Sequence, residues 1–503
     1  MLHNALLLTV VELLLRGAAL LFQRMLAAKI GAAGLGLMQL VLSVGGFAMT
    51  LGLSGLRVTA MYLCAEEYGA RNPDGMRRAI MCCLKAGAGI SALVGLGLFF
   101  LSDFAAEVWI GDARAADALR LVALFLPANC LCAILSGFFT ACDRVRELAK
   151  IETAERLAGL ALTAVLLLYA GKDAGRVCSA MVLGSALACT ASTAYQFRLL
   201  RRTFGVRRAN GADGQMRGRM LRLCVPLALS AYLRSGLVTL EQFLIPWGLS
   251  RAGGSEEAAM AAYGAIHAMV FPILMFPAAI LYTAADLLVP ELARCRAEKN
   301  VERIHHLTGT CLRMGLLYAL STACLMGALA QGLGRSICKS ESCGRYLLVF
   351  SPAVVMLYMD AMVDGMLKGF GEQTACVRYN TITSLLDVLL LYLFLPRFGL
   401  AAYILTFYLT HALNFYLSIR RLLRVTGYRG LDMRFLLRAA FCAAAGLGAA
   451  CCLPDEGLLP AMVLRAGLYA SVFLLFLELT QTVSENDRRW LRRSLRLRQG
   501  KSG

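Results

Sequence analysis

Long apolar runs restrict the folds open to this chain more than any other feature of its sequence. Two of them, over residues 220–249 and 259–290, are each longer than the roughly 20 residues that cross a bilayer as a helix. Because backbone polar groups in lipid must bond within the protein, such runs predict transmembrane helices. Hydrophobic residues make up 59% of the 503 residues and charged residues only 17%, so we expect a polytopic membrane protein without a soluble domain.

The apolar runs predict an all-α fold of about 14 transmembrane helices. We place them near residues 4–28, 35–64, 76–101, 118–141, 151–170, 176–198, 220–249, 259–290, 307–330, 345–367, 376–395, 399–420, 435–453 and 458–479. About 33 of the 51 Lys and Arg residues fall in the loops and tail on one side, against about 11 on the other. The positive-inside rule therefore predicts a multi-pass plasma-membrane protein with both termini in the cytoplasm. The net charge of +19 is then a topology signal and not a sign of nucleic-acid binding.

Short internal similarities indicate a duplication. FRLLRRTFG ends at Gly205 and IRRLLRVTG at Gly427, while Pro127 and Pro352 stand in similar segments 225 residues apart. Six helices per repeat is an even number, so the two halves share one orientation around a central cavity. We expect an N-terminal six-helix bundle over residues 1–200, a basic cytoplasmic linker over 201–219, a pseudo-symmetric C-terminal six-helix bundle over 220–424, two extra helices over 425–480 and a basic cytoplasmic tail over 481–503.

Charged residues stand inside several predicted helices, where each costs about 2.5–3.5 kcal/mol on insertion scales. The first half is mainly cationic (Arg16, Arg24, Arg57, Lys85 and Arg156) and the second mainly acidic (Glu241, Asp286, Asp360, Asp364 and Asp387). Five prolines in the pair of helices from 220 to 290 predict bends, whose freed carbonyls need other partners. Bent helices around a polar cavity are typical of a transporter.

The deep arginines are candidates for binding an anionic substrate. Arg16, Arg57 and Arg234 lie far from their helix ends, and Glu12, Arg16 and Gln23 share one face of the first helix. Guanidinium groups bind phosphate bidentately, so a cavity lined by them would attract an anionic headgroup. Mutual neutralisation of Glu12 and Arg16 is the alternative role.

Oxygen-bearing side chains of the second half form a candidate site for a coupling ion. Glu241 lies seven residues after Arg234, and Asn380, Ser384 and Asp387 share the helix over 376–395. These oxygens suit a hard cation such as Na⁺, a proton on Glu241 or Asp387 is a second hypothesis, and plain hydrogen bonding is a third. The chain has no GxxxxGK[ST] loop and no HExxH or CxxC motif, so we expect no cofactor and no firm metal site.

Most of the 18 cysteines stand singly in apolar runs, which favours a role as small buried hydrophobic residues. Cys338 and Cys343 share one predicted outer loop and could form a disulfide. We expect these two cysteines to remain unpaired.

The motifs of the second half resemble a known family of transporters. VPLALSAYLRSGLVTLEQFLIPWGL, YGAIHAMVFPILMFPAAI, LLVPELARCRAEKN and DGMLKGFGEQ are similar to segments of the stage V sporulation protein B-like oligosaccharide and lipid II flippases, within the multidrug/oligosaccharidyl-lipid/polysaccharide exporter (MOP) superfamily. The resemblance covers essentially the whole chain. It implies a V-shaped pair of bundles that alternates between inward-open and outward-open states.

The resemblance also implies a substrate and residues that bind it. An undecaprenyl-pyrophosphate-linked saccharide would move outward, with its pyrophosphate on Arg16, Arg24 and Arg57 and its lipid tail along the last two helices. Some members place sodium among helices seven, eleven and twelve, which implies a similar role for the candidate coupling residues. His267 stands where lipid II flippases typically place a cavity arginine, five residues before Pro272, which predicts a weaker or pH-dependent grip on the anion.

We therefore expect a non-enzymatic flippase for lipid II or a polysaccharide repeat unit, serving cell-wall, spore-cortex or polysaccharide synthesis. Its partners would be the lipid-linked substrate, membrane lipids and candidate wall-synthesis proteins, with the chain itself a monomer. A multidrug antiporter would need an acidic, aromatic cavity in the first half, which is cationic here. A membrane glycosyltransferase would need a larger outer loop, and a non-transporting scaffold would not need the buried charges. The sequence does not identify the saccharide or the coupling ion.

Overall fold

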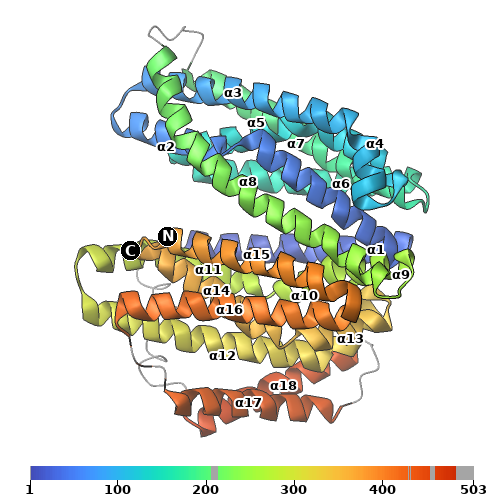
Figure 1. Cartoon of the computed structure of the whole chain (residues 1–503). Coiled ribbons are helices and arrows are strands. Elements are labelled where there is room, and N and C mark those ends of the chain that lie inside the picture. Colours follow the sequence, from blue (N-terminus) through green and yellow to red (C-terminus); the bar gives the residue numbers. More distant parts are fainter. Residues whose placement is uncertain (1, 205–212, 429, 431, 454–458, 483–503) are drawn as a thin grey trace. The chain divides into compact units, whose positions relative to one another are not determined.

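The computed structural model describes the chain apart from residues 1, 205–212, 429, 431, 454–458 and 483–503 (Figure 1). Within the described residues every regular element is helical, which confirms the all-α prediction. Most of the predicted basic tail and the centre of the basic linker lie outside this part of the chain.

The helices follow the apolar runs closely, and each of the 14 predicted ranges overlaps described helical residues. In chain order the elements are α1 (Leu2–Leu53), α2 (Leu56–Gly69), α3 (Pro73–Phe100), α4 (Ser102–Phe104), η1 (Ala105–Ile110), η2 (Ala113–Ala115), α5 (Ala116–Ala141), α6 (Val145–Tyr169), α7 (Ala174–Phe204), α8 (Asp213–Arg251), α9 (Glu256–Gly264), η3 (Ala265–Val270), α10 (Phe271–Met275), α11 (Ala278–Ala297), α12 (Val301–Leu333), η4 (Gly334–Cys338), α13 (Glu341–Phe350), α14 (Ala353–Gly369), α15 (Gln373–Phe398), α16 (Leu400–Thr426), α17 (Met433–Cys451) and α18 (Leu459–Leu479).

By length and composition, 11 helices of the described chain could cross a membrane, or 12 if the bent pair α13 and α14 forms one span. The count is lower than 14 for two reasons. One range, residues 15–69, covers both of the first two predicted helices. In addition, α6 begins with the charged sequence VRELAKIETAER, which leaves a short apolar remainder.

Residues with positive φ recur at a constant separation and support the duplication. Arg71 and Lys299, Gly111 and Lys339, Asp143 and Gly371, and Gly171 and Gly399 are four such pairs, each 228 residues apart. The caps of α3 and α12 repeat at the same separation. The Asn72 side chain accepts a hydrogen bond from the backbone N–H of Gly75, and the Asn300 side chain accepts one from Arg303, each over 3.0 Å. The two halves therefore turn at equivalent positions.

Contacts group the described chain into two compact units. Unit 1 contains residues 1–28, 265–390 and 400–503, and unit 2 contains residues 29–264 and 391–399. The units differ from the predicted bundles, because the start of α1 groups with the second repeat and α8 groups with the first. Gly31, where α1 departs from helical geometry with φ 69° and ψ −177°, lies close to the point where this helix changes unit. The predicted bundles thus stay a prediction about the repeats.

The last two helices pack on unit 1, as a pair outside the repeat. Buried Tyr469 of α18 donates a hydrogen bond to the Ser321 carbonyl of α12 over 3.0 Å, and buried Arg465 donates to the Ala450 carbonyl of α17 over 2.8 Å. In the same unit the structure joins Cys338 to Cys343 as a disulfide. The expectation that these two cysteines stay unpaired was wrong, because the end of η4 and the start of α13 bring them together.

Candidate functional site

The predicted helix over residues 259–290 is broken in unit 1. It consists of η3, α10 and α11, with Pro272 inside the broken region and Pro277 just before α11. Proline has no backbone N–H, so each one removes a hydrogen bond to a carbonyl in the preceding turn. The proline pattern correctly predicted this bend.

Side chains from other helices bind the carbonyls of the broken segment. Gln23 Nε2 of α1 donates to the Ala268 carbonyl, four residues before Pro272. Arg16 Nη1, one and a half turns earlier on the same helix, donates to the Met275 carbonyl over 3.1 Å. Arg16 and Gln23 therefore do share one face, and in unit 1 that face lies on the broken helix.

Two tyrosines complete this arrangement. Tyr358 Oη donates to the Leu274 carbonyl over 2.6 Å, and Tyr318 Oη donates to the Pro277 carbonyl over 2.8 Å. Sequence reasoning missed both, although buried tyrosines usually find a hydrogen-bond partner for their hydroxyl. The break is thus fixed from three directions, by α1, α12 and α14.

The other residues of the predicted substrate site on α1 are less buried or less defined. Arg24 is exposed and lies beside Gln23 at a narrow cleft lined also by Met269 and Ile273. The side chain of Glu12 lies outside the described part of the structure, so its pairing with Arg16 stays a prediction.

Arg57 and Arg234 belong to unit 2, and both side chains are exposed. Arg57 follows a second break, where Ser54 and Gly55 both have positive φ between α1 and α2. Tyr232 of α8 donates to the Leu51 carbonyl over 3.2 Å beside this break. Because Arg16 and Arg24 are in unit 1, convergence of these arginines on one substrate stays a prediction.

His267 lies in an aromatic cluster of unit 1. Its Nε2 is 3.0 Å from the hydroxyl of Tyr403, and its ring contacts Phe271 and Tyr403. Phe407 of α16 stacks on Phe271 in the same cluster. This histidine therefore has a defined hydrogen-bond partner, while its predicted role toward an anion stays untested.

A buried polar network links α14, α15 and α16. Asp387, 7% exposed, accepts a hydrogen bond from Thr410 over 2.9 Å. Asn414 donates to Asp360 over 2.9 Å and accepts from Thr383 over 3.4 Å. Two carboxylates from separate helices are thus connected to hydroxyl and amide oxygens inside unit 1.

The predicted coupling residues are only partly in this network. Asp387 is, but Thr383 takes the place expected for Asn380 and Ser384, which are half-buried neighbours on α15. Glu241 belongs to unit 2, where it interacts electrostatically with Tyr263. A single site formed by all four predicted residues therefore stays a prediction.

A pattern in the sequence could have revealed the network. Four buried polar residues of α16 recur at every fourth position and form one stripe: Thr406, Thr410, Asn414 and Ser418. Within the described structure, Asp360 Oδ1 and Ser418 Oγ are buried and have no hydrogen-bond partner. Such oxygens are suited to a hard cation or a proton.

The network lies near Arg16. The guanidinium of Arg16 is 6.0 Å from the ring centroid of Tyr282, and both Arg16 and Asp360 interact electrostatically with this tyrosine. A change of charge at Asp360 would therefore be felt by a candidate anion-binding residue.

About 14 helices in two related halves, with broken helices and buried charges, are the architecture of a secondary transporter. Solved structures agree with this class. The fold is similar to the lipid II flippase MurJ in an inward closed conformation, with a TM-score of 0.69 and 12% identity over 94% of this chain and 98% of that one. It is also similar to an inward-facing multidrug resistance MATE transporter of the MOP superfamily, with a TM-score of 0.64 and 16% identity over 82% and 96%. At these identities, the likeness shows the fold alone.

The sequence matches the MatE family over residues 9–164 and 233–393, so the chain belongs to the MatE family, within the MOP superfamily. A curated relative, stage V sporulation protein B of Bacillus subtilis (strain 168), is 22% identical over 382 residues, which cover 74% of this chain and 73% of the relative. The superfamily predicted from the motifs is thus confirmed. The prediction that the chain is not an enzyme is confirmed as well, because this is a family of transporters.

Proposed function

We propose that this transporter is a flippase for an undecaprenyl-pyrophosphate-linked saccharide, either lipid II or a polysaccharide repeat unit. The observation that carries the proposal is the position of Arg16, half-buried in the middle of α1 and beside the broken helix. Its bond to the Met275 carbonyl uses one Nη1 donor of a group that has five N–H donors, so the same guanidinium can also bind a phosphate oxygen. The likeness in sequence to a sporulation protein and in fold to a lipid II flippase supports this choice.

The network of α14, α15 and α16 is our candidate for the coupling site. Its residues fit a hard cation, because the buried oxygens of Asp360 and Ser418 lack hydrogen-bond partners among the described residues. Bound Na⁺ or H⁺ would neutralise Asp360 and strengthen the positive potential that Arg16 offers to an anion. Ion release would reverse this effect, so ion binding and substrate binding would favour the same state.

Cargo assays in proteoliposomes test the proposal. Vesicles with the purified protein would receive fluorescent lipid II, a second undecaprenyl-pyrophosphate-linked saccharide, or an organic cation of the kind that multidrug transporters export. We expect flipping of at least one pyrophosphate-linked lipid and no cation export. Export of the organic cation without lipid flipping would favour the multidrug alternative, and absence of both activities would favour the scaffold.

A further inference from the structure

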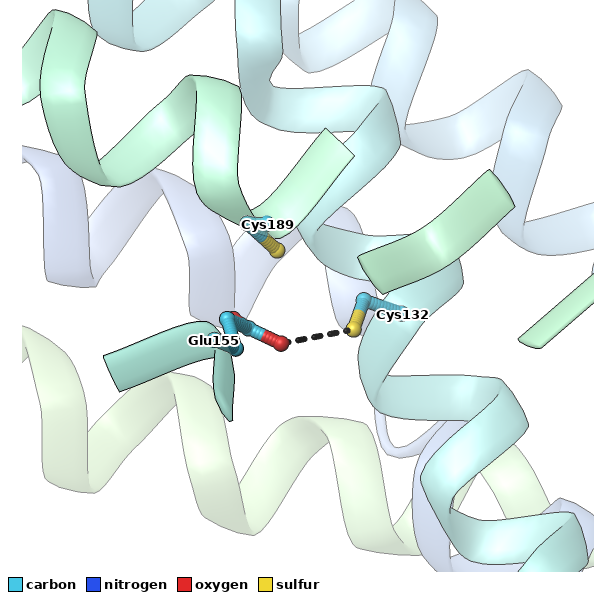
Figure 2. Close-up of side chains that lie close together, drawn as sticks. All are labelled: Cys132, Glu155 and Cys189. Atoms are coloured by element: carbon cyan, nitrogen blue, oxygen red, sulfur yellow. Dashed lines mark hydrogen bonds between the residues drawn. The ribbon is translucent and has the colours of Figure 1, made fainter. Parts of the chain in front are cut away.

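Two cysteines and a glutamate lie together inside unit 2, apart from all the residues discussed above. Cys132 is on α5, Glu155 on α6 and Cys189 on α7, and Figure 2 shows the three side chains pointing toward one another. Their potential ligand atoms all lie within 4.8 Å of one another. The cysteines are only 7% and 9% exposed, so solvent does not reach the sulfurs freely.

Two more side chains of α7 extend this cluster. Gln196, which is fully buried, donates from Nε2 to Cys132 Sγ over 3.3 Å, and Ser192 Oγ lies 3.9 Å from the same sulfur. The Gln196 Oε1 is buried and has no hydrogen-bond partner in the described structure. A half-turn of the amide would place this oxygen beside the sulfur, where Nε2 now lies. The cluster thus offers two sulfurs, one carboxylate and a choice of two neutral oxygens.

The helices that carry these side chains are closely packed, so the cluster has a firm frame. A Cβ atom at Gly184 of α7 would lie 2.7 Å from the Thr163 backbone nitrogen of α6. At Gly159 of α6, a Cβ atom would contact the Ala188 side chain at 3.7 Å. Ligands on closely packed helices hold their geometry better than ligands on loops.

We propose that Cys132, Glu155 and Cys189 bind a divalent cation of the zinc class, with Gln196 or Ser192 as the fourth ligand. Cysteine thiolates select zinc and softer ions over Na⁺ and Mg²⁺. Tetrahedral zinc has bonds of about 2.3 Å to sulfur and about 2.0 Å to oxygen, which separates these ligand atoms by about 3.5 Å. The distance of 3.7 Å between Cys132 Sγ and Glu155 Oε2 is close to this value.

The surroundings of the carboxylate also favour an ion. Cys132 is the hydrogen-bond donor to Glu155, and a thiol is a weak donor. A carboxylate inside an apolar bundle is costly when its donors are weak, and a divalent cation would offset that cost. Bound metal would also connect α5, α6 and α7 to one another.

Cadmium titration of the purified full chain tests the site, because cadmium–thiolate bonds absorb in the ultraviolet. The parent protein would carry Cys451→Ser and Cys452→Ser, which remove two exposed cysteines. We expect one cadmium per chain, displaced by Zn²⁺ but not by Na⁺ or Mg²⁺. Cys132→Ser and Cys189→Ser should each weaken binding roughly 100-fold, and Glu155→Gln roughly tenfold, whereas Cys178→Ser, at a buried cysteine of the same helix α7, should have no effect.

A second measurement needs no substitution in the site. Zn²⁺ should slow alkylation of Cys132 and Cys189 at least about tenfold and leave the rate at Cys178 unchanged. Equal rates with and without Zn²⁺ would overturn the proposal, as would unchanged cadmium affinity in the Cys132→Ser and Cys189→Ser variants. A disulfide between Cys132 and Cys189 in protein purified under reducing conditions would also overturn it, because the thiolates would then be unavailable.

Discussion

At the scale of single residues, Arg16 and Arg57 differ in how much the fold depends on them. Arg16 is half-buried and donates to a carbonyl of the broken helix, whereas Arg57 is exposed at the start of α2. We expect Arg16→Ala and Arg57→Ala each to abolish or strongly reduce flipping, because a lost charged hydrogen bond to phosphate costs about 1.5–3 kcal/mol. Flipping in vesicles and thermal unfolding in detergent would be measured side by side.

The thermal data separate the two roles of Arg16. Arg16→Ala should also lower the unfolding temperature, because the Met275 carbonyl loses its donor, while Arg57→Ala should not. Lysine at either position should restore flipping only in part, since an ammonium lacks the guanidinium fork. Flipping by Arg57→Ala at the wild-type rate would remove Arg57 from the substrate site.

Asp387 carries the second prediction at this scale. Asp387→Asn should remove the dependence of flipping on an imposed Na⁺ or H⁺ gradient, because the buried carboxylate that would bind the ion is neutralised. The control is Ser384→Ala on the same helix, at a position outside the hydrogen-bonded network. If wild-type flipping ignores both gradients and Asp387→Asn flips normally, the network is structural.

Sequence reasoning identified Asp387 but not its partners, and the reason is the orientation of one helix. Asn380, Ser384 and Asp387 were chosen for their oxygen atoms, whereas the neighbour α16 selects the face that carries Thr383 and Asp387. A shift of one residue turns a side chain by about 100° around a helix. Only packing against a partner fixes that angle.

At the scale of helices, broken segments are positioned by side chains and by close backbone contacts. A Cβ atom at Gly137 of α5 would lie 2.5 Å from the Arg57 carbonyl oxygen, which is backbone and cannot move aside. Gly137→Ala should therefore destabilise the protein by about 1–3 kcal/mol and displace Arg57. At Gly89 of α3 nothing lies within 4 Å, so Gly89→Ala should be neutral or slightly stabilising.

Thermal unfolding and flipping of the two glycine variants would check this prediction. Equal stability of Gly137→Ala and Gly89→Ala would contradict the close approach of α5 to the second break. That break itself was not predicted, because Ser54 and Gly55 carry none of the proline signal that indicated the break before Pro277. Prolines remove donors and can be read directly, whereas a serine with positive φ depends on its neighbours.

At the scale of the whole molecule, the two halves were predictable as repeats, but the compact units were not. Turns at a separation of 228 residues agree with the duplication inferred from short motifs. The grouping of the start of α1 with the second repeat depends on tertiary contacts that similarity between the halves cannot reveal. The same reason explains why Cys132, Glu155 and Cys189, far apart in sequence, were taken as separate residues.

Membrane topology gives the prediction at this scale. With both termini in the cytoplasm, exposed Lys172 lies outside the cell and exposed Arg71 inside. A membrane-impermeant thiol reagent should therefore label Lys172→Cys in intact cells above the wild-type background. It should label Arg71→Cys only after the cells are opened. The reverse pattern would place the termini outside.

The most direct test of the account is flipping of a defined undecaprenyl-pyrophosphate-linked saccharide by wild type and by the Arg16→Ala/Arg57→Ala double variant in matched proteoliposomes. The account predicts that wild type exposes the lipid on the opposite leaflet. It predicts that the double variant, inserted in equal amount, does not exceed protein-free vesicles, because both candidate pyrophosphate ligands are gone. Flipping by the double variant at the wild-type rate would contradict the claim that this transporter recognises an anionic lipid headgroup through these arginines.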